Sequence, residues 1–158
     1  MKKFFSGARN QVASKYGIIV GVVYIILLSL SYKMVDNINY FKIMSYSTYV
    51  IVFLAIGIFG SFINKANEGT LQFRELFGVV FIMILISVFM SYSYSYIYMS
   101  FIDKQLLNKL AGSKNGTPGT YEFNLGNFIF GYFQYVIMHC LFGVLVSLIL
   151  NRLAKNRK

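Results

Sequence analysis

Few side chains in this sequence of 158 residues could take part in chemistry. The one histidine, His139, stands beside the one cysteine, Cys140, inside a long apolar run. A metal site needs three or four ligands, and neighbouring residues on a helix point about 100° apart, so this pair does not predict a metal centre. We expect a neutral imidazole that is hydrogen-bonded within a helix bundle; a proton relay or a ligand contact is the alternative.

The five acidic residues form no recognisable catalytic pair, because each lies in a predicted loop or at the end of an apolar run: Asp36, Glu68, Glu75, Asp103 and Glu122. We expect Thr70 to cap a helix and Glu75 to complement the positive N-terminus of that helix. The sequence contains no glycine-rich phosphate-binding motif. We therefore predict a non-enzymatic protein without a cofactor or a metal site.

The composition indicates that lipid surrounds these residues. The chain is 57% hydrophobic and 13% charged, whereas soluble domains carry about 25% charged residues. Charged residues divide it into four uncharged runs, and a spanning helix needs about 20 mostly apolar residues. We predict an all-α, integral membrane bundle of four transmembrane helices in a single domain, at residues 16–35, 43–63, 75–98 and 127–150.

The first run could also be a signal peptide, but its apolar part is long and starts late, at Tyr16, so we favour an uncleaved helix. The third loop, with the helix extension that we expect before it, covers about residues 99–122; its glycines and the one proline predict a flexible turn.

The net charge of +10 comes from basic residues between and outside the apolar runs. This placement favours topology and anionic lipid headgroups over nucleic acid as its explanation. Ten lysines and arginines fall on one side of the four predicted spans and five on the other. The bias predicts that both termini are cytoplasmic, in a multi-pass protein of the bacterial inner membrane.

The stretch "SYSYSYIYMS" at residues 91–100 places tyrosine at every second position, which is typical of a β-strand. A lone strand cannot leave a bilayer with its backbone edges unpaired, so we interpret the stretch as helical. On one helical face, three serines form a stripe that two tyrosines continue: Ser87, Ser91 and Ser95, then Tyr94 and Tyr98. Tyr92 and Tyr96 lie on the opposite face, where we expect contact with lipid headgroups. A tyrosine-lined binding groove is the alternative.

Small residues allow membrane helices to pack closely, and each of the other runs has one such pair, four positions apart. These pairs predict a compact bundle and faces for a partner: Gly17 and Gly21, Gly57 and Ser61, Gly143 and Ser147. Gln134 shares a face with Asn127 and Gly131, which predicts interhelical hydrogen bonding. Gln134, His139, Tyr94 and Tyr98 are the polar candidates for a site.

Several features around the third run match a family pattern: Gly69-x-Leu71-x-Phe73, Gly78 and Phe101-Ile102-Asp103. With the first run, they make the chain resemble a bacterial membrane family catalogued as domain-of-unknown-function family 4199. The resemblance implies a small four-helix inner-membrane protein of the kind found mainly in Bacteroidota. It implies no activity and no catalytic residues. Members often have a proline after the aspartate; here Lys104 follows it, which predicts that the helix continues.

The leading hypothesis is a non-enzymatic accessory or scaffold subunit of a membrane complex. Such a subunit would pack against a membrane-protein partner, or against itself, through the small-residue faces. The alternative is a binding or transport module for a lipid or isoprenoid-linked substrate, which would use the tyrosine-lined outer end and the basic cytoplasmic rim. Both hypotheses include contact with the lipid bilayer and no nucleic acid partner.

Overall fold

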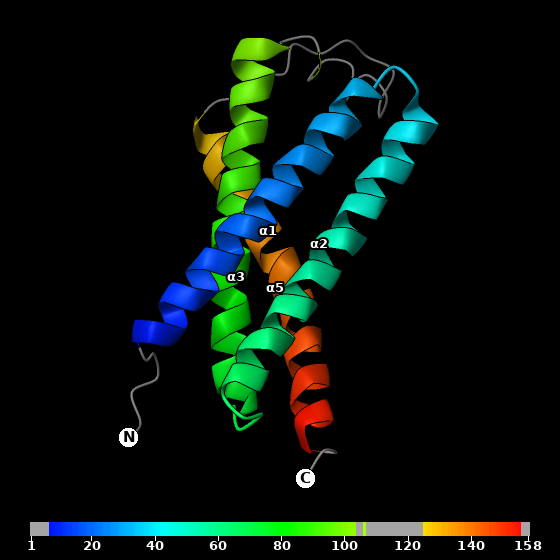
Figure 1. Cartoon of the computed structure of the whole chain (residues 1–158). Coiled ribbons are helices and arrows are strands. Elements are labelled where there is room, and N and C mark those ends of the chain that lie inside the picture. Colours follow the sequence, from blue (N-terminus) through cyan, green and yellow to red (C-terminus); the bar gives the residue numbers. More distant parts are fainter. Residues whose placement is uncertain (1–6, 104–105, 107–124, 156–158) are drawn as a thin grey trace.

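The computed structural model describes residues 7–103, 106 and 125–155 of the chain, and four long helices make up most of this part (Figure 1). The helices are α1 (Gly7–Lys33), α2 (Ile38–Ala66), α3 (Phe73–Ile97) and α5 (Leu125–Lys155). Each is long and apolar enough to cross a membrane, and the described residues contain no strand. The predicted all-α architecture of four membrane-spanning helices is therefore confirmed.

The helices alternate in direction, so that the start of α1, the α2–α3 connection and the end of α5 lie at one end of the bundle (Figure 1). Consequently α2 and α5 run the same way. Helix α3 is the central element and packs most extensively against α1 and next against α5. Its most apolar window is 44% buried, against 28–33% for the other three helices. The core along α3 is aliphatic: Leu76, Val80, Met83, Ile84 and Val88.

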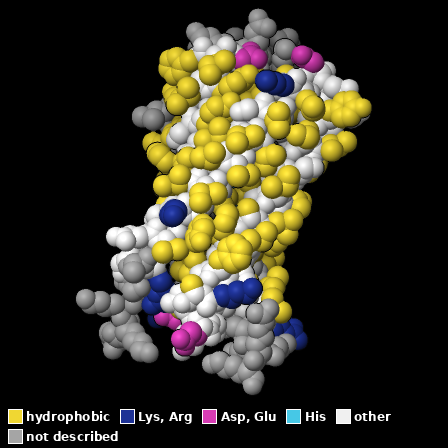
Figure 2. Space-filling model, in the orientation of Figure 1, with side chains coloured by type: hydrophobic (Ala, Val, Ile, Leu, Met, Phe, Trp, Pro, Cys, Tyr) yellow, Lys and Arg dark blue, Asp and Glu magenta, His cyan; other side chains and the backbone are white. Residues whose placement is uncertain are grey.

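The outer surface suits a bilayer. On the face in Figure 2, hydrophobic side chains cover the middle, and most Lys, Arg, Asp and Glu side chains lie toward the two ends. Many large apolar side chains of α2 and α5 are more than half exposed, such as Leu54 at 55% and Leu141 at 61%. In water this exposure would be costly, whereas in lipid it is favourable.

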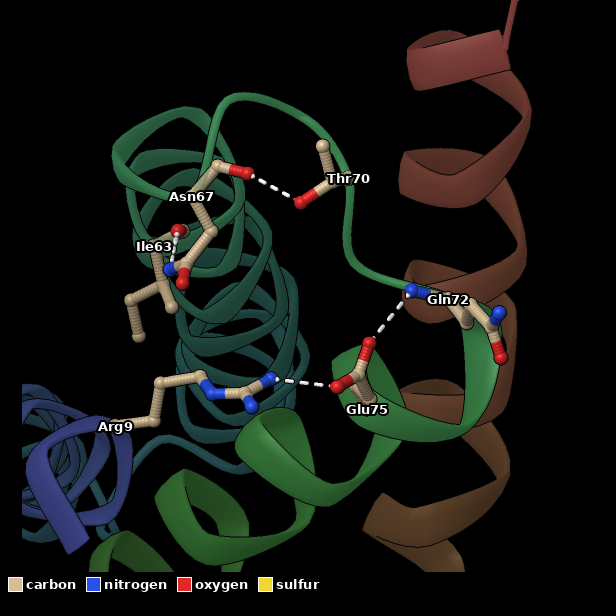
Figure 3. Close-up of polar contacts among 6 residues, drawn as sticks. All are labelled: Arg9, Ile63, Asn67, Thr70, Gln72 and Glu75. Atoms are coloured by element: carbon tan, nitrogen blue, oxygen red, sulfur yellow. Dashed lines mark hydrogen bonds and ion pairs between the residues drawn. The ribbon is translucent and has the colours of Figure 1, made fainter. Parts of the chain in front are cut away.

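Helix α1 begins at Gly7, well before the predicted start of the first span at residue 16. The added segment is polar, but Ala13 is fully buried and the Arg9 Nη1 atom lies 2.9 Å from Glu75 Oε1 of α3. An ion pair and a small buried face therefore hold this end of α1 (Figure 3). At its other end, Met34 and Val35 were predicted inside the span but lie in the turn after Lys33.

The α2–α3 connection is stabilised by its own backbone. Glu68 and Gly69 adopt positive φ angles of 57° and 67°, and Gly69 N–H donates to the carbonyl of Asn64 at 2.9 Å. This geometry closes the C-terminus of α2. The Thr70 hydroxyl donates to the carbonyl of Asn67 at 2.7 Å, so Thr70 belongs to this turn (Figure 3).

Helix α3 is capped at Gln72, and the prediction that Thr70 caps it is wrong. The Gln72 backbone N–H donates to Glu75 Oε2 at 3.1 Å, while Glu75 Oε1 accepts from Arg9 (Figure 3). The prediction that Glu75 complements the N-terminus of this helix is confirmed, because its carboxylate serves the first turn directly. Glu75 is therefore a structural residue that joins α1 to α3.

Helix α3 passes into one π-helical segment, Tyr98–Ile102, and then ends. Asp103 leaves helical geometry at φ −134° and ψ 86°, and its Oδ1 atom accepts from Leu106 N–H at 3.0 Å. The expectation that the helix continues through Asp103 is therefore wrong, because the backbone leaves helical geometry there and the Asp103 carboxylate accepts from Leu106 instead. Most of the predicted extension and loop at 99–122 lies outside the described residues.

Candidate functional site

A cavity of about 240 Å³ lies between α2 and α5, with Ile84 of α3 behind it. Its walls are aliphatic and aromatic, apart from one imidazole and one phenol: Tyr49, Val50, Phe53, Ile56, Ile84, His139, Phe142, Gly143, Leu145 and Val146. Since α2 and α5 run the same way, Tyr49 and His139 share the end nearer the α1–α2 turn. Ile56 and Val146 share the opposite, apolar end. The cavity is therefore polar at one end only.

His139 is 8% exposed and has one direct hydrogen bond, between Nδ1 and the backbone carbonyl of Tyr135 at 2.8 Å. A carbonyl can only accept, so Nδ1 carries the proton, and the neutral ring presents Nε2 as an acceptor. Within the part of the chain that the structure describes, Nε2 has no hydrogen-bond partner. The bond joins residues four apart on one helix, so it also fixes the orientation of the ring.

Three tyrosines from three helices surround this imidazole. The ring centroids of Tyr24, Tyr49 and Tyr135 lie 6.0, 5.9 and 6.1 Å from that of His139. The Tyr49 hydroxyl donates to the Tyr135 hydroxyl at 3.2 Å and so links α2 to α5. Helical spacing places Tyr135 on the same face of α5 as His139, but the sequence analysis missed Tyr24 and Tyr49. No signal along the chain identifies those two, because helix crossing alone brings them to the histidine.

Tyr94 and Tyr98, two of the predicted polar candidates for a site, lie elsewhere. The Tyr94 hydroxyl is 2.7 Å from that of Ser29 on α1, and the Tyr32 hydroxyl donates to Ser95 Oγ at 2.7 Å. The Tyr98 ring contacts that of Tyr32, with centroids 5.2 Å apart. These residues join α1 to α3, and they do not line the α2–α5 cavity.

Tyr92 and Tyr96 pack against α5. The Tyr92 ring packs against Phe128 and Tyr135 of α5, with centroids 5.2 and 5.4 Å apart, and its hydroxyl lies against Gly131. The Tyr96 ring packs against Phe128 at 5.1 Å. Both side chains are half-buried, so α5 covers part of the face of α3 on which they lie, and contact of the remaining surface with lipid headgroups stays a prediction.

Most of the predicted small-residue faces lie inside the bundle. A Cβ at Gly17 would stand 3.1 Å from Met83 Cα, and one at Gly21 would stand 3.3 Å from Ser87 Cα, so α1 and α3 approach closely here. On α5, a Cβ at Gly143 would meet Ile84 at 2.7 Å, and Ser147 is fully buried.

Four serines of α3 and α5 form hydrogen bonds through their hydroxyls within their own helices. Ser87, Ser91, Ser95 and Ser147 each donate to a carbonyl three or four residues earlier, at 2.7–3.2 Å. They therefore act as small packing residues, although Ser95 also accepts from Tyr32 of α1.

Gly57 and Gln134, which were both predicted to take part in helix contacts, lie away from the helix interfaces. A Cβ at Gly57 would have nothing within 4 Å, and Ser61, one turn later, is half-buried. Gln134 is exposed on α5 and lies outside the helix interfaces described above. The structure therefore places Gly131 against α3 and Gln134 on the surface, which separates the predicted polar trio.

No group of three or more His, Cys, Asp or Glu side chains among residues 7–103, 106 and 125–155 could hold a metal ion. Cys140 is a half-buried free thiol beside His139. Comparison with protein-family models, curated proteins and solved structures finds no match. The resemblance to family 4199 therefore stays a prediction, and the α2–α5 cavity with His139 is the strongest candidate for a site.

Proposed function

We propose that this multi-pass membrane protein binds the apolar chain of a lipid or isoprenoid-linked molecule in the α2–α5 cavity and catalyses no reaction there. One observation carries this proposal: the cavity is apolar except at one end, where His139 lines it, and His139 Nε2 has no hydrogen-bond partner among the described residues. Ligand sites combine largely apolar walls with a few polar groups that fix orientation. The absence of a carboxylate among the lining residues supports a binding role over catalysis.

The size of the cavity indicates how much of a ligand it holds. At roughly 30 Å³ for each water-sized group, 240 Å³ accommodates roughly eight such groups. This volume suits one end of a long chain, and the remainder would lie along the exposed faces of α2 and α5. Val50 and Leu145, which line the cavity, are 57% and 51% exposed, so the mouth opens toward lipid.

We assign the protein to the bacterial inner membrane with both termini in the cytoplasm. The support is the excess of lysine and arginine at the end of the bundle where α1 begins and α5 ends. The resemblance to family 4199 points to the same compartment.

Native mass spectrometry of protein extracted from its membranes in mild detergent tests the binding role. We expect one lipid species to be retained, and Val50→Phe to lower its occupancy at least tenfold because the larger side chain fills the mouth. Val22→Phe is the matched control, since Val22 is 44% exposed on α1 and does not line the cavity. Equal retention by both variants would reject the cavity as the site.

A second candidate is the accessory subunit, and Gly57 favours it. The small residues Gly57 and Ser61 lie one turn apart on α2, and no other described helix covers the surface at Gly57. Membrane helices use such small-residue surfaces for close association. A pull-down with Gly57→Leu, compared with Val22→Leu, tests this role. A stoichiometric partner lost only from Gly57→Leu would favour the accessory role, and retention by both variants would argue against it.

A further inference from the structure

We propose that the ligand is a neutral alcohol with a long apolar chain, whose hydroxyl donates a hydrogen bond to His139 Nε2. This inference rests on the proposed function and adds the chemical class of the ligand. It depends on three observations: the fixed tautomer of His139, the depth of His139 in the bundle, and the direction in which the cavity becomes apolar.

The tautomer determines what kind of group can form a hydrogen bond with Nε2. Since Nδ1 donates to the Tyr135 carbonyl, Nε2 has a lone pair and no proton. His139 is 8% exposed and lines a mostly apolar cavity, and an acceptor in apolar surroundings costs free energy when it has no donor. A ligand that offers only acceptors, such as an ether or a ketone, leaves this cost in place. A hydroxyl removes it.

The depth of the site excludes most lipid headgroups. His139 lies near the middle of α5, which runs from Leu125 to Lys155 and spans the membrane. A phosphate or carboxylate at that depth would be charged in a medium of low polarity, and no lysine or arginine lines the cavity. A phospholipid could bring only the end of an acyl chain to this position, which would leave Nε2 without a donor. A neutral hydroxyl can reside there.

The walls indicate how the chain of such an alcohol lies. Tyr49 and His139 form the polar end, and Phe53 and Phe142 follow, with ring centroids 5.7 Å apart. Ile56 and Val146 complete the cavity toward the end of α5. An alcohol with its hydroxyl at His139 therefore directs its chain away from the α1–α2 turn. The cavity holds roughly eight water-sized groups, so a chain longer than this leaves through the open side beside Leu145, which is 51% exposed.

Binding of geranylgeraniol and of its methyl ether tests the proposal. The two share a twenty-carbon isoprenoid chain, but only the alcohol has a donor. We would reconstitute the full chain in lipid nanodiscs and measure displacement of tritiated geranylgeraniol by each compound. We expect the alcohol to compete at a concentration about tenfold lower than the ether, a difference of about 1.4 kcal/mol.

The variant His139→Phe separates hydrogen bonding from the bulk of the added methyl group. Phenylalanine keeps an aromatic ring among Tyr24, Tyr49 and Tyr135 but has no nitrogen. We expect this variant to bind the alcohol and the ether with equal affinity, because it has no acceptor nitrogen for the hydroxyl of the alcohol.

The possible outcomes separate this inference from the proposed function. If the unaltered protein binds both compounds with equal affinity, the hydroxyl assignment is overturned while the cavity remains a binding site. If discrimination persists in His139→Phe, Nε2 is not the acceptor and the inference fails as well. If neither compound displaces the label and Val50→Phe binds as much label as the unaltered protein, the proposed function itself fails.

Discussion

The close approach of α1 and α3 at Gly17 makes a quantitative prediction about stability. A Cβ at Gly17 would lie 3.1 Å from Ile86 Cβ, 3.1 Å from Met83 Cα and 3.3 Å from Met83 O, and two of these atoms are backbone. Backbone cannot rotate away as a side chain can, so Gly17→Ala must separate the two helices by a few tenths of an ångström. Gly57 on α2 has nothing within 4 Å of the same position.

The comparison of Gly17→Ala with Gly57→Ala isolates the cost of that separation. Both glycines lie inside helices, and alanine gains about 1 kcal/mol over glycine in a helix interior. This gain is common to both variants and cancels in the difference, which leaves the overpacking cost of about 1–3 kcal/mol. We therefore expect Gly57→Ala to unfold at higher denaturant than the unaltered protein, and Gly17→Ala to be less stable than Gly57→Ala by about 1–3 kcal/mol.

The assay is equilibrium unfolding in mixed detergent micelles, followed by circular dichroism. Gly21→Ala serves as an intermediate case, because its closest contact, at 2.7 Å, is the flexible end of Met90. If Gly17→Ala and Gly57→Ala have the same stability, α1 and α3 do not approach as described, and the small residues of α1 would then be available to a partner.

Three further changes probe other contacts by the same assay. Glu75→Gln removes the charge that pairs with Arg9 and serves the first turn of α3, so we expect a loss of about 1 kcal/mol, and an unchanged midpoint would contradict this role. Asn64→Leu should stabilise by about 1 kcal/mol, because Asn64 Oδ1 is buried without a hydrogen-bond partner among the described residues; destabilisation would indicate a bond to a group outside them. Tyr94→Phe and Ser29→Ala should show a coupling of about 0.6 kcal/mol in a double-mutant cycle, and strictly additive effects would rule out their hydrogen bond.

The sequence predicts the four helices well because apolarity decides where a chain crosses a membrane. It fails at the polar ends of the helices, where capping and ion pairs decide instead. Helix α1 extends back to Gly7, where Arg9 pairs with Glu75 of α3 and Ala13 is buried. At the other end of α3, Asp103 leaves helical geometry and its side chain accepts from the Leu106 backbone N–H. Neither effect appears in a count of apolar residues.

The candidate site could be predicted only in part. A histidine in an apolar run is recognisable as a polar group within the membrane, and its hydrogen bond to Tyr135 follows from helical spacing. The cavity is not recognisable, because Tyr49 and Phe53 are ordinary residues of an apolar helix until α2 is placed beside α5. In the same way, the pairs at Gly17 and at Gly57 look alike in the sequence, yet one is covered by α3 and the other is not.

The packing of the bundle explains why its cavity lies between α2 and α5. Helix α3 packs closely on α1 and on α5, since small residues such as Gly17 and Gly143 let their backbones approach. Helix α2 packs mainly on α1 and touches α5 less, and there the large side chains Phe53 and Phe142 hold the two helices apart. Most of the small residues that suggested a surface for a partner, Gly57 excepted, thus stabilise the chain internally, and the loosely packed α2–α5 pair is the one that contains His139. This distribution favours a ligand over a protein partner as the occupant of that seam.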